Sequence, residues 1–123
     1  MLNSNDDCKR LKNKVAVITG AGSGIGRATA LAFAKEGASV AIVDIDEKAG
    51  KETLNLIESQ GEKGLFVKTD ITIEADVEDM VDAIIEKFGN VDILVNNAGI
   101  IKRIPILEMP VADYKQVIDI DLV

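Results

Sequence analysis

Four glycines stand at alternate positions near the start of the chain, directly after a short apolar run. The run is Val15–Ile18, with Thr19 at its end, and the glycines that follow are Gly20, Gly22, Gly24 and Gly26. Because glycine has no Cβ, the chain can turn sharply here and a phosphate can come close to the backbone. A helix starting near Gly24 would point its first N–H groups and its positive dipole end at the same place. The residue types and their spacing therefore predict a turn that binds a pyrophosphate.

An acidic residue ends the second apolar run, Ser39–Asp44. In doubly wound α/β folds, an acid about twenty residues beyond the glycines accepts hydrogen bonds from the adenosine ribose hydroxyls, and its charge repels a 2′-phosphate. Asp44 therefore favours NAD over NADP as the cofactor. Asp44 is also compatible with two other roles, as the N-cap of a helix starting near Glu47 or as a solvated loop acid.

The glycine spacing differs from the general dinucleotide fingerprint G-x-G-x-x-G, because Ile25, Arg27 and Thr29 fall where its last glycine belongs. The spacing is T-G-x-x-x-G-x-G, and a second motif, Asn96-Asn97-Ala98-Gly99, follows downstream. With these motifs, the chain from Leu11 onward resembles the N-terminal, cofactor-binding half of the classical short-chain dehydrogenase/reductase family, and it looks most like 3-oxoacyl carrier-protein reductases. The alternative is an ordinary strand-to-helix turn that needs glycines only for packing.

The resemblance implies a set of cofactor-binding residues. NADP-preferring relatives commonly carry a basic residue where this chain has Ser23, which agrees with Asp44 in favouring NAD. Asp70 and Ile71 match the family's adenine-contacting motif, although Asp70 is equally suited to an N-cap or a turn. Asn97 matches a residue that steadies the central sheet and lines the cofactor, with a plain strand-end turn as the alternative. The full implied set is Gly20, Gly22, Ser23, Gly24, Ile25, Gly26, Asp44, Ile45, Asp70, Ile71, Asn97, Ala98 and Gly99.

The resemblance also implies which residues do the chemistry, and this chain does not supply them. In the family, a Ser, a Tyr-x-x-x-Lys pair and a helix Asn carry the proton transfer. The single tyrosine here, Tyr114, is followed four positions later by Ile118, so it does not match that pair. We expect Val117–Val123 to be a helix, in which Asp121 replaces the family's relay Asn and changes its charge and its hydrogen-bond donors. No residue is therefore predicted to be catalytic.

Alternating apolar strands and amphipathic helices would position these residues. Apolar spacing predicts helices at Gly24–Lys35, Glu47–Gln60 and Ile73–Phe88, and strands at Val15–Thr19, Ser39–Asp44, Leu65–Asp70 and Asp92–Asn96. Gly37, Gly61 and Gly89 follow the helices as expected stops. The predicted fold is α/β, a Rossmann-type doubly wound parallel sheet with strand order 3-2-1-4 between two layers of helices.

We expect two parts, a polar N-terminal arm at residues 1–13 and a NAD(P)-binding domain at residues 14–123. The domain is expected to be truncated before the catalytic Ser and Tyr-x-x-x-Lys, because Val117–Val123 is apolar to its end and no Gly, Asn or Pro closes the helix. Four strands alone would also leave one edge of the fourth strand unpaired.

Composition limits the classes of function. The 123 residues suffice for one domain with a real core, and a net charge of -7 argues against a nucleic-acid partner. Cys8 is the only cysteine and there is no histidine, so we expect neither an intramolecular disulfide nor a metal site. No apolar run reaches membrane-spanning length, and the N-terminus has no signal-peptide core. We expect a soluble cytoplasmic protein.

The resemblance implies NAD-dependent hydride transfer between the cofactor and a secondary alcohol or ketone, as in 3-oxoacyl carrier-protein reductases or in polyol and sugar dehydrogenases. It also implies a homo-oligomer, a dimer or tetramer, formed through the helix that starts near Asp113. A catalytically silent dinucleotide-binding module is the alternative function. An S-adenosylmethionine methyltransferase shares a glycine-rich turn, but Thr19-Gly20 with three intervening residues and the Asn96–Gly99 motif count against it.

Overall fold

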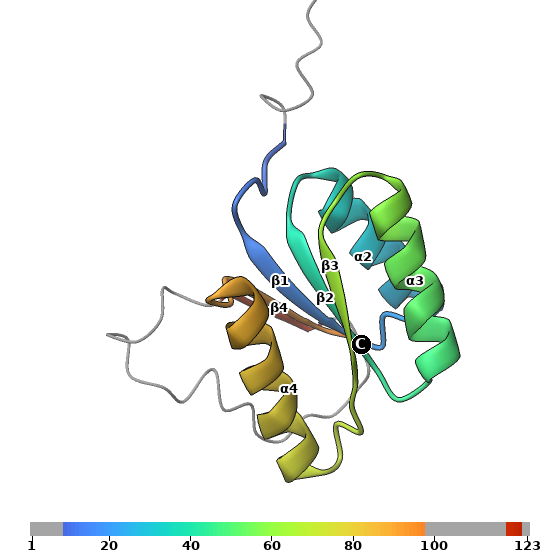
Figure 1. The fold of residues 1–123 in the computed structure, drawn as a ribbon, viewed down its shortest axis with the longest axis vertical. Coiled ribbons are helices and arrows are strands. Elements are labelled where there is room, and N and C mark those ends of the chain that lie inside the picture. Colours follow the sequence, from blue (N-terminus) through green and yellow to red (C-terminus); the bar gives the residue numbers. More distant parts are fainter. Residues whose placement is uncertain (1–8, 98–117, 122–123) are drawn as a thin grey trace, which may run out of the picture.

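The computed structural model describes residues 9–97 and 118–121. In chain order the elements are β1 (Val15–Thr19), α2 (Gly24–Lys35), β2 (Ser39–Asp44), α3 (Glu47–Ser59), β3 (Gly64–Lys68), α4 (Glu74–Phe88), β4 (Ile93–Asn96) and β5 (Ile118–Asp121). The strands form one parallel sheet in the order β3-β2-β1-β4-β5. Helices α2 and α3 lie on one side of this sheet and α4 on the other (Figure 1). The predicted doubly wound fold with strand order 3-2-1-4 is confirmed.

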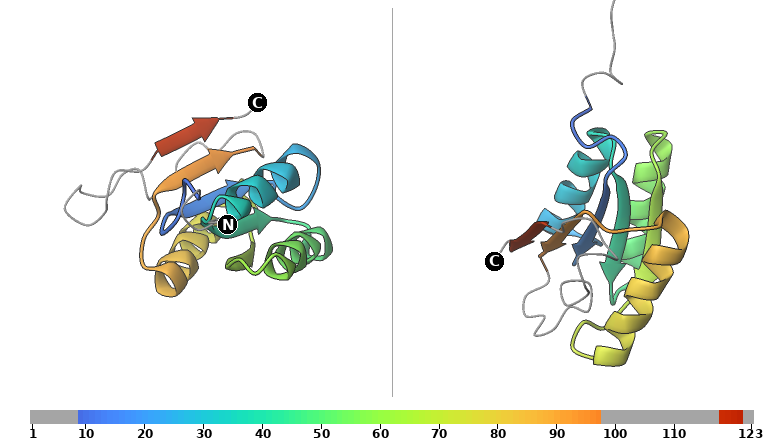
Figure 2. Two further views of the ribbon diagram at one scale, coloured as in Figure 1. Left: turned by 90° about the horizontal axis from the view of Figure 1, so that it is seen from above. Right: turned by 90° about the vertical axis from the view of Figure 1, so that its left-hand side faces the viewer.

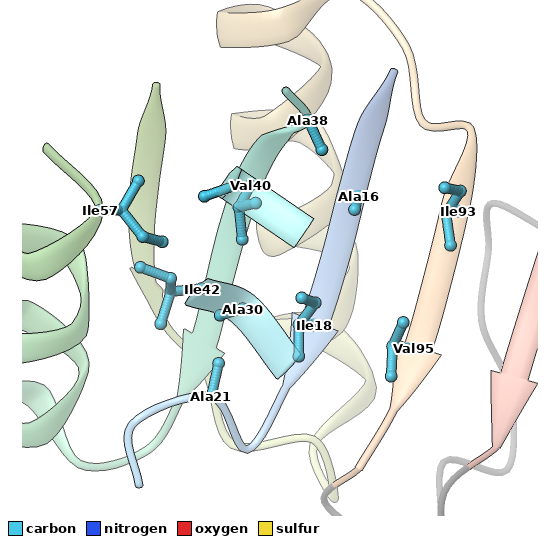
Figure 3. Packing of buried hydrophobic residues seen from close by; sticks show 11 residues of the cluster. Ala16, Ile18, Ala21, Ala30, Ala38, Val40, Ile42, Ile57, Ile93 and Val95 are labelled. Atoms are coloured by element: carbon cyan, nitrogen blue, oxygen red, sulfur yellow. The ribbon is translucent and has the colours of Figure 1, made fainter. Parts of the chain in front are cut away.

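Two apolar clusters cover the two faces of the sheet. Successive residues of the central strands point to opposite faces, so Val17 packs with α4 while Ala16 and Ile18 pack with α2 and α3. Figure 3 shows the second cluster, in which Ala30 of α2 lies over the sheet beside Ile18 and Ile42. The small Ala30 lets α2 approach the strands closely. This close packing fixes the start of α2 against the end of β1.

The element bounds agree with the sequence prediction to within a residue or two. Helix α3 ends at Ser59 instead of Gln60, and β3 is Gly64–Lys68, so Thr69 and Asp70 lie beyond its end. Gly37, Gly61 and Gly89 follow α2, α3 and α4 with positive φ angles of 97°, 81° and 88°. Glycine adopts this left-handed conformation without the strain that a Cβ brings, which explains why the helices stop where predicted.

The prediction of a helix at Val117–Val123 is wrong for the part that the structure describes. Residues Ile118–Asp121 form strand β5, which runs parallel to β4 with Ile93 paired to Ile118 and Asn96 paired to Asp121. Figure 2 shows β5 beside β4 at the end of the sheet. The sequence Ile-Asp-Ile-Asp alternates with the period of a strand, and β4 offers it an unpaired backbone edge. The expected unpaired edge of β4 is therefore covered.

A buried carboxylate ties the amino ends of β1 and β4 together. Asp92, which precedes β4, is 5% exposed, and its Oδ2 accepts a hydrogen bond of 2.8 Å from the Val15 N–H. The Asp92 N–H in turn donates to the Val15 carbonyl at 2.9 Å. This reciprocal pair provides hydrogen-bond partners for both the N–H and the carbonyl of Val15, the first residue of β1.

Among the described residues, no helix is long and apolar enough to cross a membrane.

Candidate nucleotide-binding site

The glycine turn after β1 uses a left-handed backbone conformation at Gly20 and Gly24 and the absence of a side chain at Gly26. Gly20 and Gly24 have φ angles of 65° and 57°, in the left-handed region. A Cβ on Gly26 would overlap the Gly20 carbonyl, so the backbone crosses itself there too closely for any side chain. The Gly20 N–H also donates to the Val43 carbonyl at 2.7 Å, which ties the turn to β2. The predicted turn is therefore present, and Gly26 is required by its geometry.

The N-terminus of α2 leaves room for an anion. A Cβ on Gly24 would meet nothing within 4 Å, and the N-cap residue Ser23 makes no capping hydrogen bond with its side chain. The first turn of α2 contains no acidic residue. N–H groups in a first helix turn without a side-chain cap or a competing carboxylate suit a pyrophosphate. Ile25, the next residue of α2, is 70% exposed.

Asp44 lies against the glycine turn at the end of β2. Its Oδ2 accepts a hydrogen bond of 2.8 Å from the Gly22 N–H, and its Oδ1 accepts one of 2.9 Å from the Asp46 N–H. The N-cap of α3 is Asp46, whose side chain accepts from the Ala49 N–H at 3.0 Å. The alternative that Asp44 caps this helix is therefore wrong. A carboxylate has about four lone-pair sites, so Asp44 keeps capacity for further donors.

A pocket of 170 Å³ lies at the carboxyl ends of β1, β2 and β3. Five of its lining residues belong to the predicted cofactor set, and two do not: the lining is Gly20, Val43, Asp44, Ile45, Thr69, Asp70 and Ile71. Ile45 is 59% exposed and presents an apolar surface at this pocket. In open α/β sheets, ligands bind outside the carboxyl ends of the strands. Val43 and Thr69 were missed, although their places at strand ends next to predicted site residues could have indicated them.

Asp70 forms a turn and also lines this pocket. Its Oδ1 accepts hydrogen bonds from the hydroxyl and the N–H of Thr72. These two bonds lower the pKa of Asp70 below its ordinary value, and the bond from the Thr72 hydroxyl lowers it more than the bond from the N–H. The N-cap of α4 is Ile73, so Asp70 is a turn residue instead of a cap. The carboxylate therefore stays charged at neutral pH beside the pocket.

The carboxyl end of β4 is fastened to the glycine turn through Thr19. The buried Thr19 hydroxyl lies 3.1 Å from Asn96 Oδ1, to which it donates, and accepts from the Asn97 N–H at 2.9 Å. The Asn97 side-chain amide donates to the Gly20 carbonyl at 3.4 Å. Asn97 thus steadies the glycine turn. The role implied by the resemblance, that Asn97 steadies the central sheet and lines the cofactor, stays a prediction. Thr19 was not named as a site residue, although it is the first letter of the motif.

The structure does not test some of the predicted residues and differs from the prediction at Asp121. Ala98 and Gly99 lie outside the described residues, as does Tyr114. Asp121 is at the end of β5, in register with Asn96, so the helix on which its comparison with a relay Asn depended is not present. The described ranges, 9–97 and 118–121, contain no group of three or more Cys, Asp or Glu residues that could hold a metal ion.

The fold and the site define a doubly wound α/β domain with a glycine turn and an acid at the end of the second strand, the arrangement found in dinucleotide-binding folds. A family model described as "short chain dehydrogenase" matches residues 14–123. The chain belongs to the short-chain dehydrogenase family.

Named relatives agree with this membership. The chain is 41% identical over 118 residues to 7alpha-hydroxysteroid dehydrogenase from Escherichia coli K12, covering 96% of this chain and 46% of that protein. It is 44% identical over 112 residues to an uncharacterized oxidoreductase of Thermotoga maritima, covering 91% of this chain and 44% of the relative. The chain therefore spans less than half the length of these relatives.

Solved structures agree as well. A 7α-hydroxysteroid dehydrogenase in complex with NADH and 7-oxo glycochenodeoxycholic acid superposes with a TM-score of 0.73 at 43% identity, over 92% of this chain and 43% of that one. A 3-ketoacyl-(acyl-carrier-protein) reductase from Brucella melitensis, complexed with NADH, superposes with a TM-score of 0.68 at 53% identity, over 73% of this chain and 36% of that one.

Proposed function

We propose that this chain is the NAD-binding half of a dehydrogenase that transfers a hydride between the nicotinamide ring and a secondary alcohol or ketone. One observation carries the proposal most directly: the Asp44 carboxylate is held on the Gly22 N–H, at the carboxyl end of β2 and on the wall of the 170 Å³ pocket. An acid at this place accepts hydrogen bonds from ribose hydroxyls and opposes a 2′-phosphate, which favours NAD over NADP.

The residues of the turn and the pocket have separate tasks in this proposal. The open N-terminus of α2, from Gly24 to Gly26, would hold the pyrophosphate with its N–H groups. Asp44 would accept from the ribose, and Ile45, Asp70 and Ile71 would surround the adenine. NAD, when bound, supplies the hydride acceptor. Ser23, Ile25, Asn97, Ala98 and Gly99 complete the proposed contacts, and Gly20, Gly22 and Gly26 shape the backbone.

The substrate class is proposed from the relatives. The names of the relatives refer to hydroxyl or keto groups, as in hydroxysteroid, 3-ketoacyl and, for a Corynebacterium glutamicum relative at 38% identity, L-2,3-butanediol. A secondary alcohol or ketone is common to these compounds. We place the proton-transfer chemistry in a longer enzyme of which residues 14–123 are the cofactor-binding domain and residues 1–13 a polar arm, because the single Tyr114 has no lysine four positions later.

Calorimetric titration of the chain with NAD and with NADP tests the proposal. We expect NAD to bind more tightly, and Asp44→Ala to weaken NAD by roughly 10- to 150-fold, since a hydrogen bond to a charged group contributes roughly 1.5–3 kcal/mol. Asp44→Asn keeps the size of the side chain, removes the charge and turns one of the two accepting oxygens into an NH2 donor, so it should also weaken NAD binding. A folded chain that binds neither nucleotide, or that binds NADP more tightly, would contradict the proposal.

A catalytically silent module that only binds NAD is the second candidate, because the sequence contains no Tyr-x-x-x-Lys pair. Transfer of label from tritiated NADH to a ketone distinguishes the two. Transfer of tritium to the ketone by the protein isolated from its own cells supports the enzyme. Binding of NAD without such transfer supports the silent module.

We also propose a cytoplasmic homo-oligomer, a dimer or tetramer, without nucleic-acid or membrane partners. The proposal is supported by the net charge of -7, by the absence of a spanning helix in the described residues and by the family to which the chain belongs. Light scattering of the purified protein gives the oligomeric state. A monomer at all concentrations would contradict the oligomer.

A further inference from the structure

We propose that Arg27 of α2 and Thr53 of α3 act as a positioning pair that sets the orientation of Asp44 through one peptide group of the glycine turn. The inference rests on the proposed function, since it concerns how the ribose-binding acid is held. Arg27 and Thr53 are 26 positions apart in the sequence and neither lines the 170 Å³ pocket. Arg27 and Thr53 therefore act on the pocket indirectly, through Asp44, which lines it.

The pair forms a short hydrogen-bonded chain that ends on the turn. Thr53 is fully buried, and its hydroxyl donates to the Ala21 carbonyl at 2.9 Å. The Arg27 Nε–H donates to the same hydroxyl oxygen at 2.9 Å, and its Nη2 donates to the Ala49 carbonyl at 3.1 Å. Because the Thr53 hydroxyl oxygen accepts from Arg27, its hydrogen is directed to a carbonyl oxygen. The Ala21 carbonyl, at 2.9 Å, is nearer than the Ala49 carbonyl, at 3.3 Å.

The carbonyl of Ala21 and the N–H of Gly22 belong to the same peptide group. This group is planar and trans, so its oxygen and its hydrogen point in opposite directions. Thr53 holds the oxygen, and the hydrogen is directed at Asp44 Oδ2, 2.8 Å from the Gly22 nitrogen. A rotation of this peptide would therefore break both bonds at once. Through this group, Thr53 determines where the donor to Asp44 lies.

The surroundings leave the turn little freedom to adjust in another way. Ala21 is fully buried in the core cluster shared by α2 and the sheet (Figure 3). A Cβ on Gly22 would lie 2.7 Å from Asp44 Oδ2 and 3.0 Å from the Ala49 side chain. Since the turn cannot slide, loss of the Thr53 hydroxyl would be accommodated by rotation of the Ala21–Gly22 peptide. The Gly22 N–H would then turn away from Asp44.

Thr53→Val tests the inference because valine has nearly the shape of threonine without the hydroxyl. We expect NAD affinity of the full chain to fall by about tenfold and NADP affinity to fall less, so that the preference for NAD narrows. Thr53→Ser restores the hydroxyl and should restore both affinity and preference. Glu52→Gln is the matched control, because the ion pair of Glu52 with Arg27 is exposed on the Glu52 side at 57% and the other Arg27 bonds remain.

A second readout needs no nucleotide. In an NMR spectrum of the chain, the Gly22 amide should exchange faster with solvent in Thr53→Val than in the parent, because its hydrogen bond to Asp44 is weakened. If Thr53→Val does not fold, Arg27→Lys removes the Nε bond while keeping the charge, and the same narrowing of preference is expected.

The outcomes separate the two proposals. Equal weakening of NAD and NADP, or an unchanged Gly22 amide, would show that Thr53 is merely structural and would overturn the inference. A parent chain that does not distinguish or bind the nucleotides would overturn the proposed function itself, and the inference with it. Narrowed preference in Thr53→Val with recovery in Thr53→Ser supports both.

Discussion

Gly26→Ala is the substitution that tests the glycine turn most sharply. The added methyl group would overlap the Gly20 carbonyl and lie 2.7 Å from the Asn97 side-chain nitrogen. The Gly20 carbonyl is part of the backbone and cannot rotate away as a side chain can. The first turn of α2 must therefore move outward from β1, which loosens the packing of the fully buried Ala30 and Ala34 against the sheet.

The expected loss of stability follows from two opposing effects. Forcing a methyl group into a closely packed site costs roughly 3 kcal/mol or somewhat more, at the upper end of overpacking. Alanine favours a helix over glycine by about 1 kcal/mol, which offsets part of this cost. We therefore expect a net loss of about 2 kcal/mol, equivalent to a melting temperature lower by roughly 10 °C in a domain of this size.

Thermal and urea unfolding followed by circular dichroism measure this loss. Thr29→Ala is the control in the same helix, since Thr29 is half-buried and its hydroxyl donates to the Ile25 carbonyl one turn earlier in α2, so its substitution should change stability by less than about 0.5 kcal/mol. Gly50→Ala is a second comparison, because its Cβ would meet the ring of Phe66, a side chain that can shift. A Gly26→Ala protein as stable as Thr29→Ala, or more stable than Gly50→Ala, would refute the steric reasoning.

Two further substitutions concern other carboxylates. Asp92→Ala should cost about 1–3 kcal/mol of stability in urea unfolding, because it leaves the buried Val15 N–H without its acceptor; a loss below 0.5 kcal/mol, roughly the range of surface changes, would contradict this. Thr72→Val should raise the pKa of Asp70, measured by NMR titration, because it removes the hydroxyl bond that lowers it most. Since the folded pKa of Asp70 lies below its ordinary value of 3.8, its stabilising contribution is present above the unfolded pKa and is lost as pH falls through the folded pKa. An unchanged titration in Thr72→Val would show that the backbone N–H bond alone sets this pKa.

The order of elements could be predicted because the spacing of apolar residues and the positions of the helix-ending glycines agreed along most of the chain. The apolar run at Val15–Thr19 and the left-handed glycines after each helix fixed the bounds to within a residue or two. The segment Ile118–Asp121 was predicted to be helical although Ile-Asp-Ile-Asp also alternates with the period of a strand, because so short a pattern does not decide between the two. Its pairing with β4 is a tertiary contact that the local sequence does not specify.

In the candidate site, too, the sequence predicted residues that belong to local motifs but not contacts that only the fold creates. The glycine spacing and Asp44 were found from motif positions, and the structure brings Gly20, Asp44 and Asp70 to one pocket. The sequence could not separate a ribose-facing Asp44 from a helix cap, because Asp46 two positions later is an equally good cap. Arg27 and Thr53 carried no signal, since only the packing of α2 on α3 brings them together.

The buried Asp92 has a consequence for how this protein could be altered. Its bonds to Val15 fasten the amino ends of β1 and β4, while Asp44 and the pocket lie at the carboxyl ends of the strands. Substitutions at the two ends share no partner, so their free-energy effects should add. Stability changes at Asp92 and changes in nucleotide binding at the proposed site are therefore expected to be independent. Stability that a substitution at the carboxyl ends removes could be recovered at the amino ends.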